Sequence, residues 1–157
     1  MTASNGQPRP AQTIVALDVG TVRIGVASAR LDVAIAQPLA TLEQGPDTIA
    51  EIAKLVADGP AERLVVGWPR GLEGQATQQT TAVEAFVAEL RQTLDVPVEL
   101  QDEALTSRKA EAELESRGKA FSRADVDALA ATYILEDYLA ERLHRSGQID
   151  QAVVPHV

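Results

Sequence analysis

Apolar and polar positions alternate in a way that predicts three strands in the first third of the chain. Residues 14–17, IVAL, carry no polar side chain, which is typical of a strand covered on both faces. Gly20 and Thr21 supply the first turn, and Pro38 is expected to bend or end the last strand. The predicted strands cover residues 13–19, 24–29 and 33–42. Because their connections are short, neighbouring strands in this set are expected to be antiparallel.

After the third strand the spacing of apolar residues changes to the helical period, interrupted by two short apolar runs. The elements predicted from this pattern are helix 47–57, strand 64–67, helix 77–93, strand 97–101, helix 105–116 and a last helix from Ser122 to about His144. Asp125 lies three residues after Ser122, an acidic variant of the capping box that opens a helix.

This order of elements predicts an α/β fold with a five-stranded mixed sheet and helices on both faces. Three antiparallel strands come first, and each later strand can join the sheet by a right-handed crossover. A length of 157 residues suits one domain. We expect a disordered polar leader over residues 1–12, a single domain over 13–145 and a ragged tail over 146–157.

Composition restricts the chemistry and the location. The chain has no cysteine, which excludes thiol nucleophiles and cysteine-ligated zinc and agrees with a reducing cytoplasm. No apolar run approaches the roughly 20 residues that span a bilayer, and residues 1–12 do not resemble a signal peptide. We therefore expect a cytoplasmic protein with no membrane partner.

A formal net charge of −9 disfavours non-specific binding to nucleic acid, which depends on Lys and Arg. The basic residues are nevertheless unevenly distributed, and several fall within one short segment: Arg108, Lys109, Arg117, Lys119 and Arg123. This segment is either a solvated helix and loop of mixed charge or a basic rim on an acidic body.

Three carboxylates lie where a carboxylate is costly or conspicuous. Asp18 ends an apolar strand, and a buried carboxylate without a partner normally becomes neutral. Glu103 continues the polar row of the fifth strand, which includes Gln101. Asp127 shares a helix face with small and apolar residues such as Ala131. All three acids would be tolerated if they converged on a divalent cation.

Oxygen ligands without cysteine or a nearby histidine favour Mg²⁺ or Mn²⁺ over zinc. The alternative is that Asp18, Glu103 and Asp127 are unrelated acids at a turn, a strand end and a helix surface. The residues alone leave both interpretations open.

Four segments in this order resemble the YqgF/RuvX family: LDVGTVRIGVA, VVGWPRGLEG, DEALTS and VDALAATYIL. The resemblance covers about residues 13–140 and implies a ribonuclease H-like fold. Members are described as Holliday junction resolvases or as nucleases that mature the 5′ end of pre-16S rRNA. The resemblance therefore implies phosphodiester hydrolysis in branched DNA or precursor rRNA, and resolution of a junction with two symmetric strands would suit a homodimer.

The resemblance also implies catalytic and metal-binding roles for Asp18, Glu103 and Asp127. Two Mg²⁺ or Mn²⁺ ions would flank the scissile phosphate, with Asp18 bridging them. No protein general base is then needed, which agrees with histidines only at His144 and His156, near the C-terminus.

Further residues are candidates for contacts with nucleic acid: Arg23, Arg70, Thr106, Ser107, Arg108, Lys109, Lys119 and Arg123. Arg23 follows the first turn and would meet a phosphate or form a surface ion pair. Arg70 lies in a glycine-containing loop whose backbone amides can approach a phosphate. Thr106 and Ser107 would cap the helix that follows, whose N-terminus favours an anion. Trp68 would stack on a base or pack against the protein.

Two positions depart from the family pattern. Ala104 replaces the arginine of the usual DERLT segment, and Val22 stands where lysine is usual. We hypothesise that Arg108, four residues after Ala104, takes over the phosphate contact. Both departures remove positive charge, so they are expected to affect affinity more than chemistry.

Two other functions remain open at this point. Actin-like and sugar-kinase ATPases also carry Asp-x-Gly-Thr after a strand, as residues 18–21 do here, but they close two related domains over a nucleotide. A catalytically inert nucleic-acid-binding module with a degenerate site is the second alternative, and it predicts the loss of at least one of the three acids.

Overall fold

The computed structural model describes residues 12–69, 73–103, 112–116 and 122–153, with side chains of the last helix described as far as Arg142. The elements are β1 (Thr13–Val19), β2 (Arg23–Arg30), β3 (Ala36–Glu43), α1 (Thr48–Asp58), β4 (Ala61–Pro69), α2 (Gln78–Thr93), β5 (Val98–Glu103) and α4 (Arg123–Val153). The strands form one five-stranded sheet in the order β3-β2-β1-β4-β5. Pairs β1–β2 and β2–β3 are antiparallel, whereas β1–β4 and β4–β5 are parallel. The predicted mixed sheet is confirmed.

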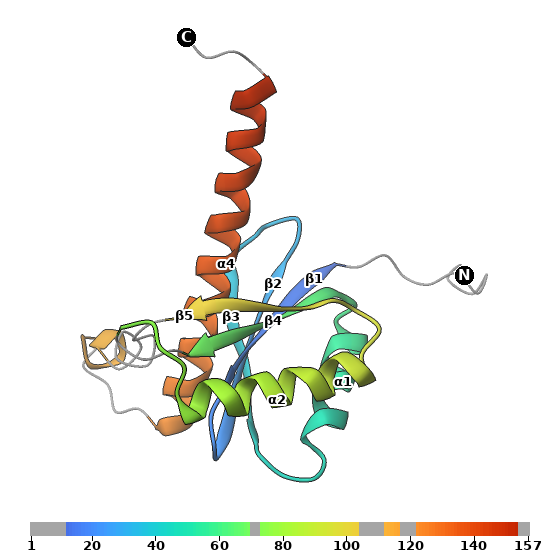
Figure 1. The fold of residues 1–157 in the computed structure, drawn as a ribbon, viewed down its shortest axis with the longest axis vertical. Coiled ribbons are helices and arrows are strands. Elements are labelled where there is room, and N and C mark those ends of the chain that lie inside the picture. The colour runs from blue at the N-terminus through green and yellow to red at the C-terminus, as the bar shows by residue number, and fades with distance from the viewer. Residues whose placement is uncertain (1–11, 70–72, 104–111, 117–121, 154–157) are drawn as a thin grey trace, which may run out of the picture.

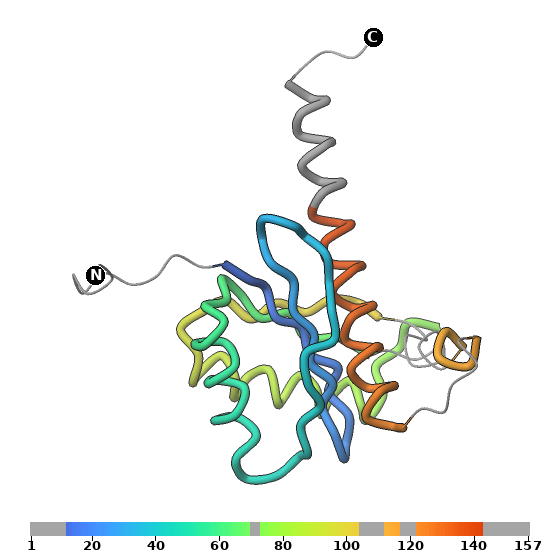
Figure 2. Tube along the Cα trace, turned by 180° about the vertical axis from the view of Figure 1, so that it is seen from behind, coloured from blue at the N-terminus to red at the C-terminus, as the bar shows by residue number. Residues whose placement is uncertain are grey.

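Helices cover both faces of the sheet, as predicted: α1 and α2 on one side and α4 on the other (Figures 1 and 2). Large aliphatic side chains fill the α1–α2 side, where Leu17 packs with Ile52 and Val87. The α4 side is built from smaller residues, with Ala16 and Ala27 against the helix. Small side chains allow α4 to lie close to the strands, which matters for the acids at its N-terminal end.

Helix α4 lies very close to the sheet at Gly25 of β2. A Cβ atom on Gly25 would lie 1.8 Å from the backbone oxygen of Asp127, so any other residue here would force the strand and the helix apart. Gly25 also pairs with Asp18 across the β1–β2 ladder. The glycine therefore brings the backbone of α4 next to the strand position of Asp18.

The third strand, predicted over residues 33–42, starts later than predicted, at Ala36, and continues past Pro38 to Glu43. Pro38 does not end β3, because β3 is an edge strand and the missing N–H breaks no essential ladder bond. The register instead shifts between Val26 and Ala27, whose partners are Ala40 and Pro38, so Leu39 forms a bulge. The strand starts late because Ala34 has a φ of 58° in the turn that precedes it.

The last helix begins as predicted and ends later. The amide of Ser122 donates to Asp125 Oδ2 over 3.0 Å and the amide of Asp125 donates to Ser122 Oγ over 3.2 Å, which confirms the capping box. The helix continues past the expected end near His144 to Val153, so residues 146–153 are helical rather than ragged.

Two other expectations are tested only in part. Of the helix predicted over residues 105–116, the described residues 112–116 are helical. The leader predicted over 1–12 lies outside the described residues except for Gln12. Within the described ranges, no helix combines the length and the hydropathy needed to cross a bilayer.

Candidate active site

Asp18, Glu103 and Asp127 come from three elements that meet at one edge of the sheet. Strands β1, β4 and β5 are parallel, so their carboxyl ends lie on the same side, next to the first turns of α4 (Figure 1). Asp18 is the second-last residue of β1, Glu103 is the last of β5, and Asp127 lies near the start of α4. The topology thus gathers acids that are up to 109 positions apart in the sequence.

The Asp18 carboxyl is held in an environment that opposes its ionisation. Burial, and then the negative charges of Glu103 and Asp127, raise the pKa of Asp18 from 3.8 to about 7. Both carboxylates therefore lie close enough to repel it. The three side chains predicted to converge thus lie in one neighbourhood, where the charges of Glu103 and Asp127 act on Asp18.

Gly67 gives the Glu103 side chain its place over β4. A Cβ atom on Gly67 would lie 2.4 Å from Glu103 Oε2 and 2.5 Å from Ile134 Cδ1. In the β1–β4 ladder Val66 pairs with Leu17, which puts Gly67 beside Asp18. Because position 67 has no side chain, the Glu103 carboxylate lies across the strand that separates β5 from β1. Sequence reasoning did not identify this glycine.

The other two residues of the β5 polar row form hydrogen bonds with residues farther along α4. Glu99 accepts a hydrogen bond of 3.1 Å from the Tyr138 hydroxyl, and Gln101 Nε2 donates over 2.8 Å to Glu141 Oε2. The predicted alternation along this strand is therefore confirmed. Glu103, at the end of the row, is the member that belongs to the acidic site.

Asp127 forms an ion pair with Arg23, the first residue of β2. Arg23 Nε donates to Asp127 Oδ2 over 2.7 Å, and the two side chains are 30% and 21% exposed. The turn before Arg23 is closed by a hydrogen bond of 2.9 Å from the Gly20 amide to the Arg23 carbonyl. Of the two roles expected for Arg23, the structure contains the ion pair.

Two glutamines hold the turn that follows Asp18. Gln79 Nε2, near the start of α2, donates to the Val19 carbonyl over 2.8 Å. Gln44 Nε2, just after β3, donates to the Gly20 carbonyl over 3.0 Å. These side chains fix the end of β1 from two directions. Nothing in the sequence distinguishes them from other surface glutamines.

The donor set fits a hard divalent cation, although its present arrangement is incomplete. Within the described ranges, no three Asp, Glu, His or Cys side chains are arranged to hold one metal ion. Asp18, Glu103 and Asp127 nevertheless offer only carboxylate oxygens, the ligands of Mg²⁺ and Mn²⁺. Burial, and then repulsion from Glu103 and Asp127, raises the pKa of Asp18, and a bound cation would offset these effects by favouring the ionised carboxylate.

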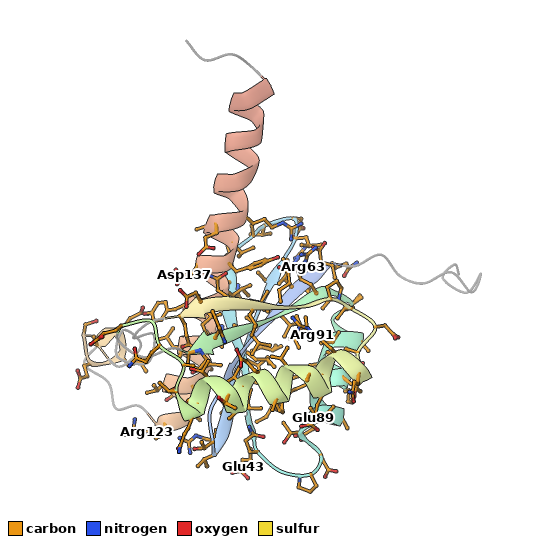
Figure 3. All side chains as sticks on the ribbon, in the orientation of Figure 1. Glu43, Arg63, Glu89, Arg91, Arg123 and Asp137 are labelled. Atoms are coloured by element: carbon orange, nitrogen blue, oxygen red, sulfur yellow. The ribbon has the colours of Figure 1, made fainter. Side chains whose placement is uncertain are left out.

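Most of the predicted nucleic-acid contacts lie outside the described residues, and two lie within them. Those outside the described residues are Arg70, Thr106, Ser107, Arg108, Lys109 and Lys119, together with Ala104. Arg123 is exposed at the first position of α4 (Figure 3). Val22 is 62% exposed in the turn after Asp18. Trp68 Nε1 donates to Glu84 Oε2 over 3.0 Å.

The chain matches a known family over most of its length. Residues 12–141 match the model described as "RuvX: Holliday junction resolvase". A Chloroflexus aggregans protein named "Putative pre-16S rRNA nuclease" is 44% identical over 135 residues, which cover 83% of this chain and 95% of that protein. A protein of the same name from Dechloromonas aromatica is 38% identical, with coverage of 84% and 93%.

Solved structures share the fold. Thermus thermophilus RuvC in complex with Holliday junction substrate matches with a TM-score of 0.51 and 18% identity, covering 83% of this chain and 96% of that chain. The fowlpox virus Holliday junction resolvase matches with a TM-score of 0.50 and 11% identity, covering 82% of this chain and 99% of that chain. The predicted ribonuclease H-like fold is confirmed.

Proposed function

This chain belongs to the RuvX family, and on that premise we propose that it is an endonuclease dependent on Mg²⁺ or Mn²⁺. Its proposed reaction is hydrolysis of phosphodiester bonds in structured nucleic acid, with 5′-end maturation of pre-16S rRNA as the first candidate. The name carried by its relatives supports this substrate. The structural observation that carries the proposal is the convergence of Asp18, Glu103 and Asp127 at one sheet edge.

In this proposal the three acids are the metal ligands and the catalytic residues. Asp18 lies between the other two, Glu103 reaches it across Gly67, and Asp127 approaches from α4. A pair of bound cations would generate hydroxide from water and stabilise the leaving oxygen. The protein supplies the rigid arrangement of carboxylates, because Asp18 and Glu103 end strands and Asp127 lies on a helix packed against Gly25.

The ionisation of Asp18 links the structure to this chemistry. With its pKa raised to about 7, the Asp18 carboxyl carries a proton in part of the metal-free molecules at neutral pH. A bound dication favours the ionised form and releases that proton. Metal affinity is therefore expected to rise with pH through this range.

Binding of the nucleic acid is assigned to basic residues around the acids. Arg23 lies at the edge of the site, and Arg123 lies exposed at the start of the helix that carries Asp127. The other proposed contacts are Arg70, Thr106, Ser107, Arg108, Lys109 and Lys119. A few arginines close to the acids would direct a phosphate to the site despite the net charge of −9.

Holliday junction DNA is the second candidate substrate, because the matching family model carries that description. Symmetric resolution requires two active sites, so this alternative includes a homodimer. The chain retains all three acids, which argues against an inert module with a degenerate site. For either nucleic acid we propose a cytoplasmic location.

The test is a cleavage assay with two substrates and three metal conditions. Purified protein is incubated with a 5′-extended 16S rRNA precursor and with a four-way DNA junction, each with Mg²⁺, Mn²⁺ or EDTA. We expect cleavage of the RNA precursor with either metal and none with EDTA. Cleavage of the junction alone would transfer the assignment to the second candidate, and cleavage of neither substrate would overturn the proposal.

A further inference from the structure

We propose that Arg23 holds Asp127 away from the metal position in the metal-free protein, and that metal binding requires Arg23 to release it. Arg23 is thus a positioning residue for the third ligand. The inference rests on the proposed function, because it assumes that Asp18, Glu103 and Asp127 together bind a cation. It goes beyond that function by predicting that the contact of Arg23 with a phosphate and the completion of the metal site occur together.

The first observation is the ion pair. Arg23 Nε lies 2.7 Å from Asp127 Oδ2, a charge-assisted hydrogen bond of short length. Both side chains are mostly shielded from solvent, with 30% and 21% exposure, so water screens their attraction less than it would at an open surface. The Arg23 guanidinium is therefore the cation that the Asp127 carboxylate contacts in this structure.

The second observation is that the acids are close but are not arranged as ligands. Glu103 and Asp127 both act electrostatically on Asp18, which places all three in one neighbourhood. Within the described part of the chain, however, no three such side chains form a group that could hold an ion. Asp127, one of the three carboxylates, is instead paired with the guanidinium of Arg23.

The surrounding structure limits the change to the side chains of Arg23 and Asp127. The Gly20 amide bonds to the Arg23 carbonyl over 2.9 Å, and Gln44 Nε2 bonds to the Gly20 carbonyl over 3.0 Å, so the backbone of the turn is fixed. Gly25 fixes the backbone of Asp127 by direct contact. Rotation of these two side chains is then the available movement.

Charge explains why the release of Asp127 by Arg23 should depend on the bound nucleic acid. A dication at Asp18 and Glu103 is repelled by the guanidinium and also lacks Asp127 as a ligand. A phosphate of the bound nucleic acid gives Arg23 an alternative acceptor. Once Arg23 binds that phosphate, Asp127 is available to the metal. Loading of the complete site is therefore favoured when nucleic acid is present.

The first experiment measures the affinity for Mn²⁺ alone by calorimetry, without nucleic acid. The wild type is compared with Arg23→Gln, with Arg23→Lys and with the control Arg30→Gln. Arg30 pairs with Asp32 on the exposed surface, so this control removes one positive charge away from the site. We expect Arg23→Gln to bind Mn²⁺ about three- to tenfold more tightly than the wild type, because the variant removes the repulsion between the guanidinium and the dication. Arg30→Gln and Arg23→Lys are expected to stay within about twofold of the wild type.

The second experiment observes Arg23 directly in the wild type by ¹⁵N NMR of its Nε–H group, assigned by its absence in Arg23→Lys. We expect a hydrogen-bonded, slowly exchanging signal in the metal-free protein, which changes to the signal of a solvent-exposed guanidinium at saturating Mg²⁺. This measurement keeps the inference testable if Arg23→Gln does not fold.

The outcomes separate the inference from the proposed function. If the wild type binds Mn²⁺ and Arg23→Gln binds it no more tightly, or if the Nε–H signal does not respond to Mg²⁺, the role of Arg23 is refuted and the proposed function stands. If neither the wild type nor any variant binds Mn²⁺, both are refuted.

Discussion

Glu103 occupies space that a side chain at Gly67 would fill: a Cβ atom on Gly67 would lie 2.4 Å from Glu103 Oε2. The two residues lie on neighbouring strands, and the missing side chain allows the acid at the end of β5 to reach across β4. On the other side of Asp18, Gly25 admits the backbone of Asp127 in the same way. Two glycines thus determine how closely the three acids approach one another.

Gly67→Ala is expected to reduce cleavage strongly and stability moderately. The added methyl group displaces the Glu103 carboxylate and presses on Ile134. A displacement of about 1 Å in a catalytic group can cost on the order of 100-fold in rate, and overpacking typically costs about 1–3 kcal/mol. The rate is measured in the cleavage assay and the stability by urea denaturation. Gly45→Ala is the control, because a Cβ atom there meets nothing within 4 Å.

Gly25→Ala is expected to destabilise the protein more than Gly67→Ala. Its methyl group would lie 1.8 Å from the backbone oxygen of Asp127, and backbone packed on a sheet cannot move aside as a side chain can. We expect a loss of about 3 kcal/mol or more in the free energy of unfolding, measured by urea denaturation. Equal stability of Gly25→Ala and the wild type would contradict the close packing of α4 on β2.

Metal-free stability should depend on pH through Asp18. Its folded pKa is raised from 3.8 to about 7, so the folded state binds the proton more tightly than the unfolded state. The stabilisation that comes from keeping the Asp18 carboxyl protonated in the folded state is therefore fully present below about pH 4. It is lost as the pH rises to about 7. Asp18→Asn lacks this titration. In EDTA we expect the variant to equal the wild type near pH 4 and to exceed it by up to about 4 kcal/mol at pH 8.

Thermal or urea unfolding of both proteins at several pH values measures this difference. Mg²⁺ should stabilise the wild type more than Asp18→Asn, because it favours the ionised carboxylate. A constant difference between the two proteins from pH 4 to pH 8 would show that the pKa of Asp18 is not raised.

Ser122→Ala tests the start of the helix that carries Asp127. The Ser122 hydroxyl accepts a hydrogen bond of 3.2 Å from the Asp125 amide, and its loss should cost about 1 kcal/mol of unfolding free energy. Asp127 lies in the adjacent turn, so cleavage should also fall, by less than for Gly67→Ala. Urea denaturation and the cleavage assay give the two quantities. An unchanged stability would mean that the cap is absent in solution.

The sequence predicted features that depend on local pattern. The apolar run before Asp18, the alternation along β5 and the apolar face around Asp127 isolated the three acids. The spacing of Ser122 and Asp125 predicted the start of α4. Each signal is contained within a few neighbouring residues.

Other features depend on contacts between distant segments, and no local pattern contains them. Gly67 and Gly25 are unremarkable strand glycines until Glu103 and α4 are placed over them. The pairing of Arg23 with Asp127 joins residues 104 positions apart. Pro38 was expected to bend or end its strand; the register shifts beside it, and its position at the sheet edge allows the strand to continue.

The central claim is that Asp18 holds a divalent cation for phosphodiester hydrolysis. Its most direct test compares single-turnover cleavage of the 5′-extended 16S rRNA precursor in Mg²⁺ by the wild type, by Asp18→Asn and by Asp32→Asn. Asp32 pairs with Arg30 on the exposed surface, so it controls for loss of one negative charge. The account predicts cleavage by the wild type and Asp32→Asn and a loss of at least about 1,000-fold for Asp18→Asn. Equal cleavage by Asp18→Asn and the wild type would contradict it.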